Sequence, residues 1–470
     1  MKKLQNYSLF RKLYFLNIFM TSIIFFDVIS YVIEGFMMIW AIFIIIEKIK
    51  NKQITKIINY KFLIAFLISA FITTLLQIKM FKPINTGFDF IMLIHFCICF
   101  FALYGLHSEK MENIKEEMIK LMQWITSITT SITFLSIFAL IFKKRFIISG
   151  KIFNLNPFSY CVGMHFADGS DRLSGFYINP NIIAFCSVVC IVFSNILFIK
   201  NRFFRKFKRY TQISLFIAFI ILNSAALILS DSVASFILLL SYIILILFYY
   251  LVLKKKKFNV RIFIKNLIIF LTIGITTLIT LMIIRGNFQN VASELMNNIY
   301  STFSTDDINY SEQENIIVGR GKNYNLSNGS GRRHLWKQAL LIFTRNPIVG
   351  IGIGNIEDYG KIYFKKGVDF SNFHNGYVSI AVSYGIIGLI FFISFLLLTF
   401  IYLLKALRKS FKVKNTVYPH LIAIVASYCI YSLFEKTMLS EINYMGVFFW
   451  LILGYTTAFA SNLLKSSEDI

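Results

Sequence analysis

The chain has 470 residues, of which 57% are hydrophobic and only 15% are charged. Soluble domains average about 25% charged and about 45–50% apolar residues, so this composition excludes an ordinary soluble protein and indicates an integral membrane protein. The net charge of +25 lies mostly in short loops between apolar stretches. There it suits anionic lipid head groups, and we expect no nucleic-acid partner.

Twelve apolar stretches predict an all-α, polytopic membrane fold, because a membrane-crossing helix needs about 20 apolar residues. Asp27 and Glu34 lie within the first two stretches, which favours a tight hairpin over one long helix. No small-residue cleavage site follows the basic N-terminus, so we expect the first stretch to remain as an anchor. The predicted spans are residues 13–28, 31–47, 61–78, 88–106, 121–142, 181–199, 211–229, 233–253, 262–284, 376–404, 418–434 and 442–463.

Lysine and arginine are divided unevenly between the two sets of loops. One set contains 30 of the 48 basic residues, in short segments that adjoin the spans. Cytoplasmic loops carry such an excess, so we expect both termini to be cytoplasmic and the other loops to face outward. The basic set comprises residues 1–12, 48–61, 107–120, 200–210, 254–265, 405–414 and 465.

These patterns divide the chain into three regions. Residues 1–284 form a transmembrane region with spans one to nine and an outward loop at 143–180. Residues 285–375 form a large outward loop that contains the catalytic segment, and residues 376–470 carry the last three spans. Within the large loop, residues 287–303 and 332–345 predict short amphipathic helices.

The end of the large loop concentrates the polar and small residues. Arg332 and Trp336 are four residues apart, so on a helix they share a face, and Asn346-Pro347 ends that helix. The run G-I-G-I-G at 350–354 follows no strand, so it is not a dinucleotide-binding motif, and we interpret it as a flexible connector. His374 precedes an apolar run, which places an imidazole at a membrane surface.

Four segments resemble the bacterial O-antigen ligase and O-antigen polymerase superfamily, whose members are polytopic, GT-C-like glycosyltransferases. They transfer glycans from undecaprenyl diphosphate at the outer face of the cytoplasmic membrane. The resemblance implies functional roles for Arg172, Arg332 and His374. The segments are R-L-S-G-F-Y-I-N-P-N (172–181), S-G-R-R-H-L-W-K-Q-A-L (330–340), N-P-I-V-G-I-G-I-G-N (346–355) and H-N-G-Y…Y-G-I-I-G (374–388).

The chemistry of these three residue types agrees with that assignment. The planar guanidinium of arginine grips phosphate oxygens bidentately, and a diphosphate needs two or more cations. Arg332 lies in the first turn of its predicted helix, where free N–H groups add positive potential. An imidazole titrates near neutral pH, so His374 is a candidate base for a sugar hydroxyl. An interfacial anchor is the alternative role for each arginine and for the histidine.

Further candidate substrate-binding residues lie beside these three. Asp231, in the turn L-S-D-S-V, is a candidate to orient His374 or to bind sugar hydroxyls. Packing or interfacial anchoring is the alternative for the aromatic candidates. The set comprises Arg333, Trp336, Asn375, Tyr377 and Asp231.

We expect no metal ion and no cofactor. The best cluster is His165 with Asp168 and Asp171, but the two carboxylates are three residues apart and do not form a D-x-D pattern. The candidate arginines would take the place of a metal at the diphosphate.

The sequence predicts an enzyme that transfers undecaprenyl-diphosphate-linked glycan, with inversion, at the outer face of a bacterial inner membrane. The favoured form of this reaction is the polymerisation of O-antigen or capsule repeat units. A ligase that delivers the glycan to lipid A-core or protein is the alternative within this class. A polysaccharide or lipid transporter is the alternative outside it, although broken helices in matching halves would be expected there. The expected partners are lipid-linked oligosaccharides, membrane lipids, a chain-length regulator and a flippase.

Overall fold

The computed structural model confirms an all-α polytopic membrane fold. It describes residues 6–106, 109–142, 145–152, 156–167, 170–204, 207–253, 260–303, 318, 332–363, 373–413 and 415–465. The helices are α1 (Tyr7–Met20), α2 (Asp27–Lys50), α3 (Tyr60–Gln77), α4 (Pro83–Cys97), α5 (Met111–Phe142), α6 (Pro180–Ile199), α7 (Arg209–Ser230), α8 (Val233–Phe248), α9 (Val260–Phe303), α10 (Arg332–Arg345), α11 (Ile356–Tyr363), α12 (Gly376–Lys412), α13 (Tyr418–Tyr431) and α14 (Tyr444–Lys465). Short helical segments at Ile54–Lys56, Ile98–Leu103 and Tyr249–Leu253 and three strands complete the described elements.

The helices form two compact units. The first unit contains α1 to α4, the beginning of α5 and α10 to α14. The second contains the remainder of α5, the three strands and α6 to α9.

Each of the twelve predicted apolar stretches overlaps a helix. Within the described residues, ten helices are long and apolar enough to cross a membrane. The other two are α13, a shorter apolar helix, and α1, each of 14 residues. Apolar run length therefore located the helices, but it overstated the length of α1.

The predicted hairpin exists, but its turn comes earlier than expected. Helix α1 ends at Met20 and α2 begins at Asp27, so neither Asp27 nor Glu34 lies in the turn. Residues 22–25 of this connection belong to the second unit, within which Ile23 forms an antiparallel bridge with Tyr177. This extended pairing ends the first helix well before its apolar run does.

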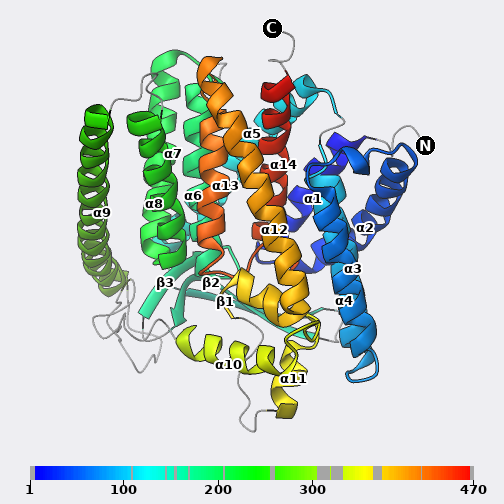
Figure 1. Cartoon of the computed structure of the whole chain (residues 1–470). Helices are drawn as coiled ribbons and strands as arrows, with labels where there is room; N and C mark the ends of the chain where they lie inside the picture. The colour runs from blue at the N-terminus through cyan, green and yellow to red at the C-terminus, as the bar shows by residue number, and fades with distance from the viewer. Residues whose placement is uncertain are drawn as a thin grey trace. The chain divides into compact units, whose positions relative to one another are not determined.

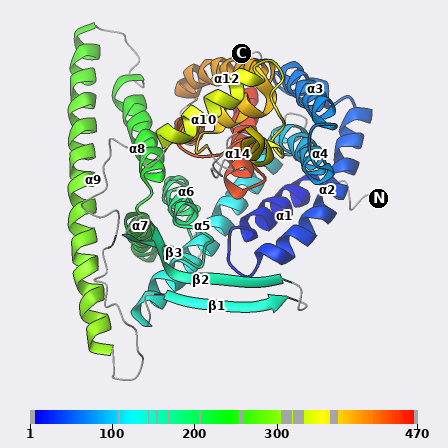
Figure 2. The same cartoon turned by 90° about the horizontal axis from the view of Figure 1, so that it is seen from below.

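A three-stranded antiparallel sheet occupies the segment that was predicted only as a loop at 143–180. Strands β1 (Arg145–Ile152) and β2 (Asn156–Ala167) form a long hairpin, and β3 (Ser170–Gly175) pairs with β2 (Figure 2). In the sequence of β2, the apolar residues Phe158, Tyr160, Val162 and Met164 alternate with small or polar residues, which is the pattern of a half-buried strand. That period of two was present in the sequence but was not recognised.

Helix α9 is continuous from Val260 to Phe303. The sequence analysis predicted a span ending at 284 and a separate amphipathic helix at 287–303. No proline or glycine pair interrupts residues 284–287, so the helical backbone has no reason to break there.

The core of the first unit surrounds α14, which packs against α1, α12 and α13. Trp450 on α14 is fully buried, and its ring lies 4.8 Å from that of Phe100 and 5.7 Å from that of Phe395. Aromatic pairs at these separations add to the stabilisation from buried area. This packing holds the starts of α12 and α14 at the end of the unit where α10 lies (Figure 1).

Helix α12 is interrupted at Gly385, whose φ of 65° and ψ of −170° are non-helical. A Cβ at this position would lie 2.1 Å from the carbonyl oxygen of Ile348, so only glycine fits. The N–H of Ile386 donates to the carbonyl of Pro347 at 2.8 Å. The chain after α10 thus replaces a hydrogen bond that the interruption removes.

The backbone of the glycine run, residues 350–354, forms hydrogen bonds with the interrupted turn of α12. The N–H groups of Ile351 and Gly352 donate to the carbonyls of Val382 and Ser383 at 3.2 and 2.9 Å. The interpretation of this run as a flexible connector is therefore wrong, because its backbone is bonded to the open turn of α12. The glycine run after α10 and the interrupted turn of α12 are therefore joined by backbone hydrogen bonds.

Candidate functional site

His374 lies immediately before α12, on a segment that the helix start holds in place. Asn375 is the N-cap of α12, and its side chain accepts hydrogen bonds from the N–H groups of Tyr377 and Val378, both at 3.0 Å. This satisfies N–H groups that have no partner within the helix. His374 itself has a φ of 46°, in the left-handed region, which turns the chain sharply just before the cap.

The start of α12 is bonded to residues 432–443, the segment between α13 and α14. The N–H of Gly376 donates to the carbonyl of Ser432 at 2.8 Å. A Cβ on Gly376 would come within 3.2 Å of the carbonyl oxygen of Thr437, so the close approach favours glycine. The Tyr377 hydroxyl donates to the carbonyl of Cys429 at 3.0 Å. The imidazole is therefore placed beside the 432–443 segment.

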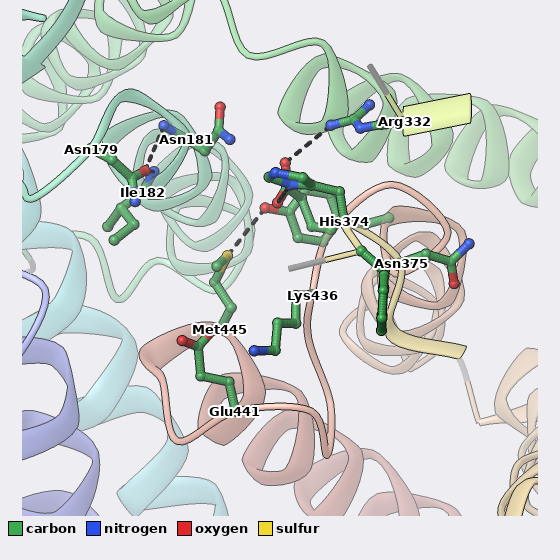
Figure 3. A network of polar contacts seen from close by, with 12 residues as sticks. Asn179, Asn181, Ile182, Arg332, His374, Asn375, Lys436, Glu441 and Met445 are labelled. Atoms are coloured by element: carbon green, nitrogen blue, oxygen red, sulfur yellow. Dashed lines mark hydrogen bonds and ion pairs between the residues drawn. The ribbon is translucent and has the colours of Figure 1, made fainter. Parts of the chain in front are cut away.

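Glu435, on that segment, contacts two of the predicted site residues with its two oxygens. Its Oε2 lies 3.2 Å from Nδ1 of His374, and its Oε1 lies 3.4 Å from a terminal nitrogen of Arg332. The Glu435 side chain is 5% exposed, against 15% for Arg332 and 33% for His374. Figure 3 shows the guanidinium of Arg332 directed toward a carboxylate oxygen, which is Oε1 of Glu435.

Arg332 is the first residue of α10, a helix with the bounds that the sequence predicted. The helix runs across the direction of α12 (Figure 1) and buries Gln338, Ala339 and Ile342. The indole Nε1 of Trp336 donates to the carbonyl of Phe373 at 3.0 Å. One face of α10 is thus fixed to the residue before His374.

Five predicted residues lie together in the first unit: Arg332, Trp336, His374, Asn375 and Tyr377. Arg333 is also on α10 and is exposed. Asn375 and Tyr377 stabilise the start of α12 through their hydrogen bonds. Trp336 positions the backbone next to His374. Their roles in substrate binding stay predictions.

Arg172 and Asp231 belong to the second unit. Arg172, on β3, donates from Nε to the carbonyl of Ser230 at 2.9 Å and from a terminal nitrogen to Oδ1 of Asn181 at 2.8 Å. Asp231 is fully buried and forms an ion pair with Arg285. The role of Arg172 at a diphosphate and that of Asp231 at His374 or a sugar stay predictions.

Glu435 is the contact of His374 Nδ1 that sequence reasoning missed. It lies 61 residues from the histidine in the chain, and no spacing rule connects the two. The available signal was a carboxylate directly after an apolar helix, at a membrane boundary where acidic residues tend to be paired or functional.

The arrangement can move a proton and hold a negative charge. A carboxylate at Nδ1 favours the tautomer that leaves Nε2 as the basic nitrogen. A guanidinium within the same cluster can bind phosphate oxygens. Among the described residues, no group of three or more His, Cys, Asp or Glu side chains is placed to hold a metal ion.

A family model described as O-antigen ligase matches residues 216–393. That range includes Arg332 and His374, whereas Arg172 and Glu435 lie outside it. No curated protein matches the chain. Three of the four motif segments lie within this range, and the resemblance is confirmed over this part of the chain.

Proposed function

We propose that this polytopic membrane protein, which matches the O-antigen ligase family over residues 216–393, transfers a glycan from undecaprenyl diphosphate to a sugar hydroxyl without a metal ion. The observation that carries the proposal is the contact of one carboxylate, Glu435, with both His374 and Arg332. A base and a phosphate-binding cation in one cluster are what such a transfer requires.

His374 acts as the general base. The acceptor hydroxyl gives its proton to Nε2 while its oxygen bonds to the anomeric carbon of the donor sugar. The bond between that carbon and the diphosphate oxygen breaks, and its electron pair leaves with undecaprenyl diphosphate. Attack and departure occur on opposite faces, so the anomeric centre is inverted. The imidazolium then returns its proton to water.

Arg332 binds the leaving diphosphate. The charge on the bridging oxygen grows as the glycosidic bond breaks, and a guanidinium held beside it stabilises that charge more in the transition state than in the ground state. Arg172 is a second candidate ligand for the diphosphate, on the strength of the motif at 172–181.

The site works at the outer face of the cytoplasmic membrane in this proposal. The uneven distribution of basic residues supports that orientation, since 30 of the 48 lie in the opposite set of loops. Lipid-linked repeat units are then the substrates, with a flippase to supply them and a chain-length regulator as a partner.

Polymerisation of O-antigen or capsule repeat units is the form of the reaction that we favour, because the large polar loops suit two bulky lipid-linked substrates. Ligation of the finished glycan is the second candidate, since the matching family model carries that description.

One experiment separates the two and tests the transfer itself. The purified chain in lipid nanodiscs is given a single lipid-linked repeat unit, and the products are resolved by size. A polymerase yields a ladder from this substrate alone, whereas a ligase yields product only after lipid A-core or an acceptor protein is added. His374→Ala should remove product in either case, with His334→Ala, an exposed histidine on α10, as the matched control. A product ladder from well-folded His374→Ala would exclude this mechanism.

A further inference from the structure

Glu435 is shared between two groups that perform different tasks in the proposed reaction. Oε1 contacts the guanidinium of Arg332, and Oε2 contacts the imidazole of His374. The three side chains come from three separate elements, namely α10, the segment before α12 and the 432–443 segment. The carboxylate is nearly buried, so its interactions with both partners are screened little by water.

The shared carboxylate links the charge on Arg332 to the basicity of His374. While the guanidinium is paired with Glu435, it offsets the negative charge that the imidazole experiences. A diphosphate bound to the guanidinium supplies compensating negative charge, so the imidazole then experiences more of the charge on Glu435. A carboxylate at Nδ1 stabilises the imidazolium and strengthens the base.

We propose that Glu435 is a positioning residue that couples donor binding at Arg332 to the strength of His374 as a base. The inference rests on the proposed function and adds an order of events to it. The base reaches full strength only when the donor diphosphate has engaged Arg332. An acceptor hydroxyl is therefore activated in the presence of a donor and not in its absence.

Other charged or titratable groups lie near the cluster. Tyr377 is on α12 and Tyr428 on α13, and Glu435 acts electrostatically on Tyr428. Lys436 and Glu441 lie on the same segment as Glu435 (Figure 3). Glu441 accepts a hydrogen bond from Asn443 and is exposed, which makes it a matched control carboxylate.

The test compares Glu435→Gln with Glu441→Gln in the full chain in nanodiscs. Glu435→Gln keeps the shape of the side chain and removes its charge. We expect turnover to fall by about 10-fold or more, up to the roughly 10²–10⁴-fold that a general base contributes. Binding of the probe, undecaprenyl diphosphate, should be unchanged or tighter, because Arg332 no longer has a competing carboxylate.

The pH dependence gives the readout that a purely structural role would not change. Two acid limbs are compared in the wild type. The limb of kcat reports the donor-bound enzyme, and the limb of kcat/KM for the donor reports the free enzyme. We expect the first to lie at higher pH than the second. In Glu435→Gln both limbs should move to lower pH, because the imidazolium has lost its carboxylate, and the gap between them should narrow. Glu441→Gln should leave both limbs in place.

Two results would overturn the coupling. An unchanged gap between the limbs in Glu435→Gln would mean that the carboxylate does not transmit donor binding. Loss of undecaprenyl diphosphate binding together with turnover would mean that Glu435 only maintains the local structure. Failure of the proposed function is a different result, in which His374→Ala and Arg332→Ala remain active.

Discussion

The indole of Trp336 donates a hydrogen bond to the carbonyl of Phe373, the residue directly before His374. Helix α10 therefore carries Arg332 at its first residue and, one turn later, fixes the backbone that presents the base. The cation and the base are positioned by the same short helix.

Trp336→Phe should lower kcat without unfolding the protein. An aromatic ring is retained, although a smaller one, but the indole N–H is lost, and a hydrogen bond of this kind contributes roughly 0.5–1.5 kcal/mol. We expect kcat to fall by about threefold to tenfold. Trp124→Phe, at an exposed position on α5, is the control in the same steady-state assay. Wild-type turnover in Trp336→Phe would show that the bond does not position His374.

Arg332→Lys should impair the reaction nearly as much as Arg332→Ala. A lysine ammonium is a point charge and cannot form two parallel hydrogen bonds to phosphate oxygens. Binding of undecaprenyl diphosphate and turnover should both decline, measured by titration and by product ladders. Arg345→Lys, at the exposed end of α10, is the matched control. Full activity in Arg332→Lys would exclude bidentate phosphate binding there.

Gly385→Ala should destabilise the protein strongly. The left-handed backbone alone costs about 1–3 kcal/mol for other residues. The new Cβ would also press on the carbonyl of Ile348. Thermal unfolding in detergent should show a large loss of stability, whereas Gly35→Ala, with no atom within 4 Å of the added carbon, should differ little. Equal stabilities for the two variants would contradict the pairing of the glycine run with α12.

The orientation predicts which positions are reachable from outside the cell. In a variant whose six native cysteines are replaced, a cysteine at Lys361 should react with an impermeant reagent in intact cells, and one at Lys52 should not. Both side chains are exposed. Labelling at Lys52 alone would reverse the orientation and remove the site from outward-facing substrates.

Activity should persist in EDTA, because Arg332 supplies the positive charge that a metal would otherwise provide. The assay is the same product ladder with and without the chelator. Recovery of lost activity by magnesium or manganese would implicate the acidic residues near His165, where Asp168 lies outside the described residues.

The sequence predicted the helices better than their boundaries. Apolar length determines whether a segment can cross a bilayer, so each of the twelve stretches overlaps a helix. The end of α1 depends instead on the bridge between Ile23 and Tyr177, which joins residues distant in the chain. The break in α12 likewise depends on the arrival of the glycine run, and local propensity could not locate it.

Those parts of the site that lie in a recognisable motif or spacing could be predicted from the sequence. Arg332 and His374 were identified, and the bounds of α10 were predicted in full. Glu435 was not connected to them, because its contact with His374 arises from the packing of α12 against the 432–443 segment. Tertiary proximity of this kind leaves no periodic trace in a single sequence.

The left-handed backbone at His374 also limits which substitutions of this residue can yield an inactive protein with its local structure intact. Bulky and β-branched residues are strained at positive φ, whereas asparagine adopts it readily. Asparagine would therefore keep the turn before α12 while removing the imidazole. For trapping the intact donor on the protein, that single replacement preserves the local geometry best.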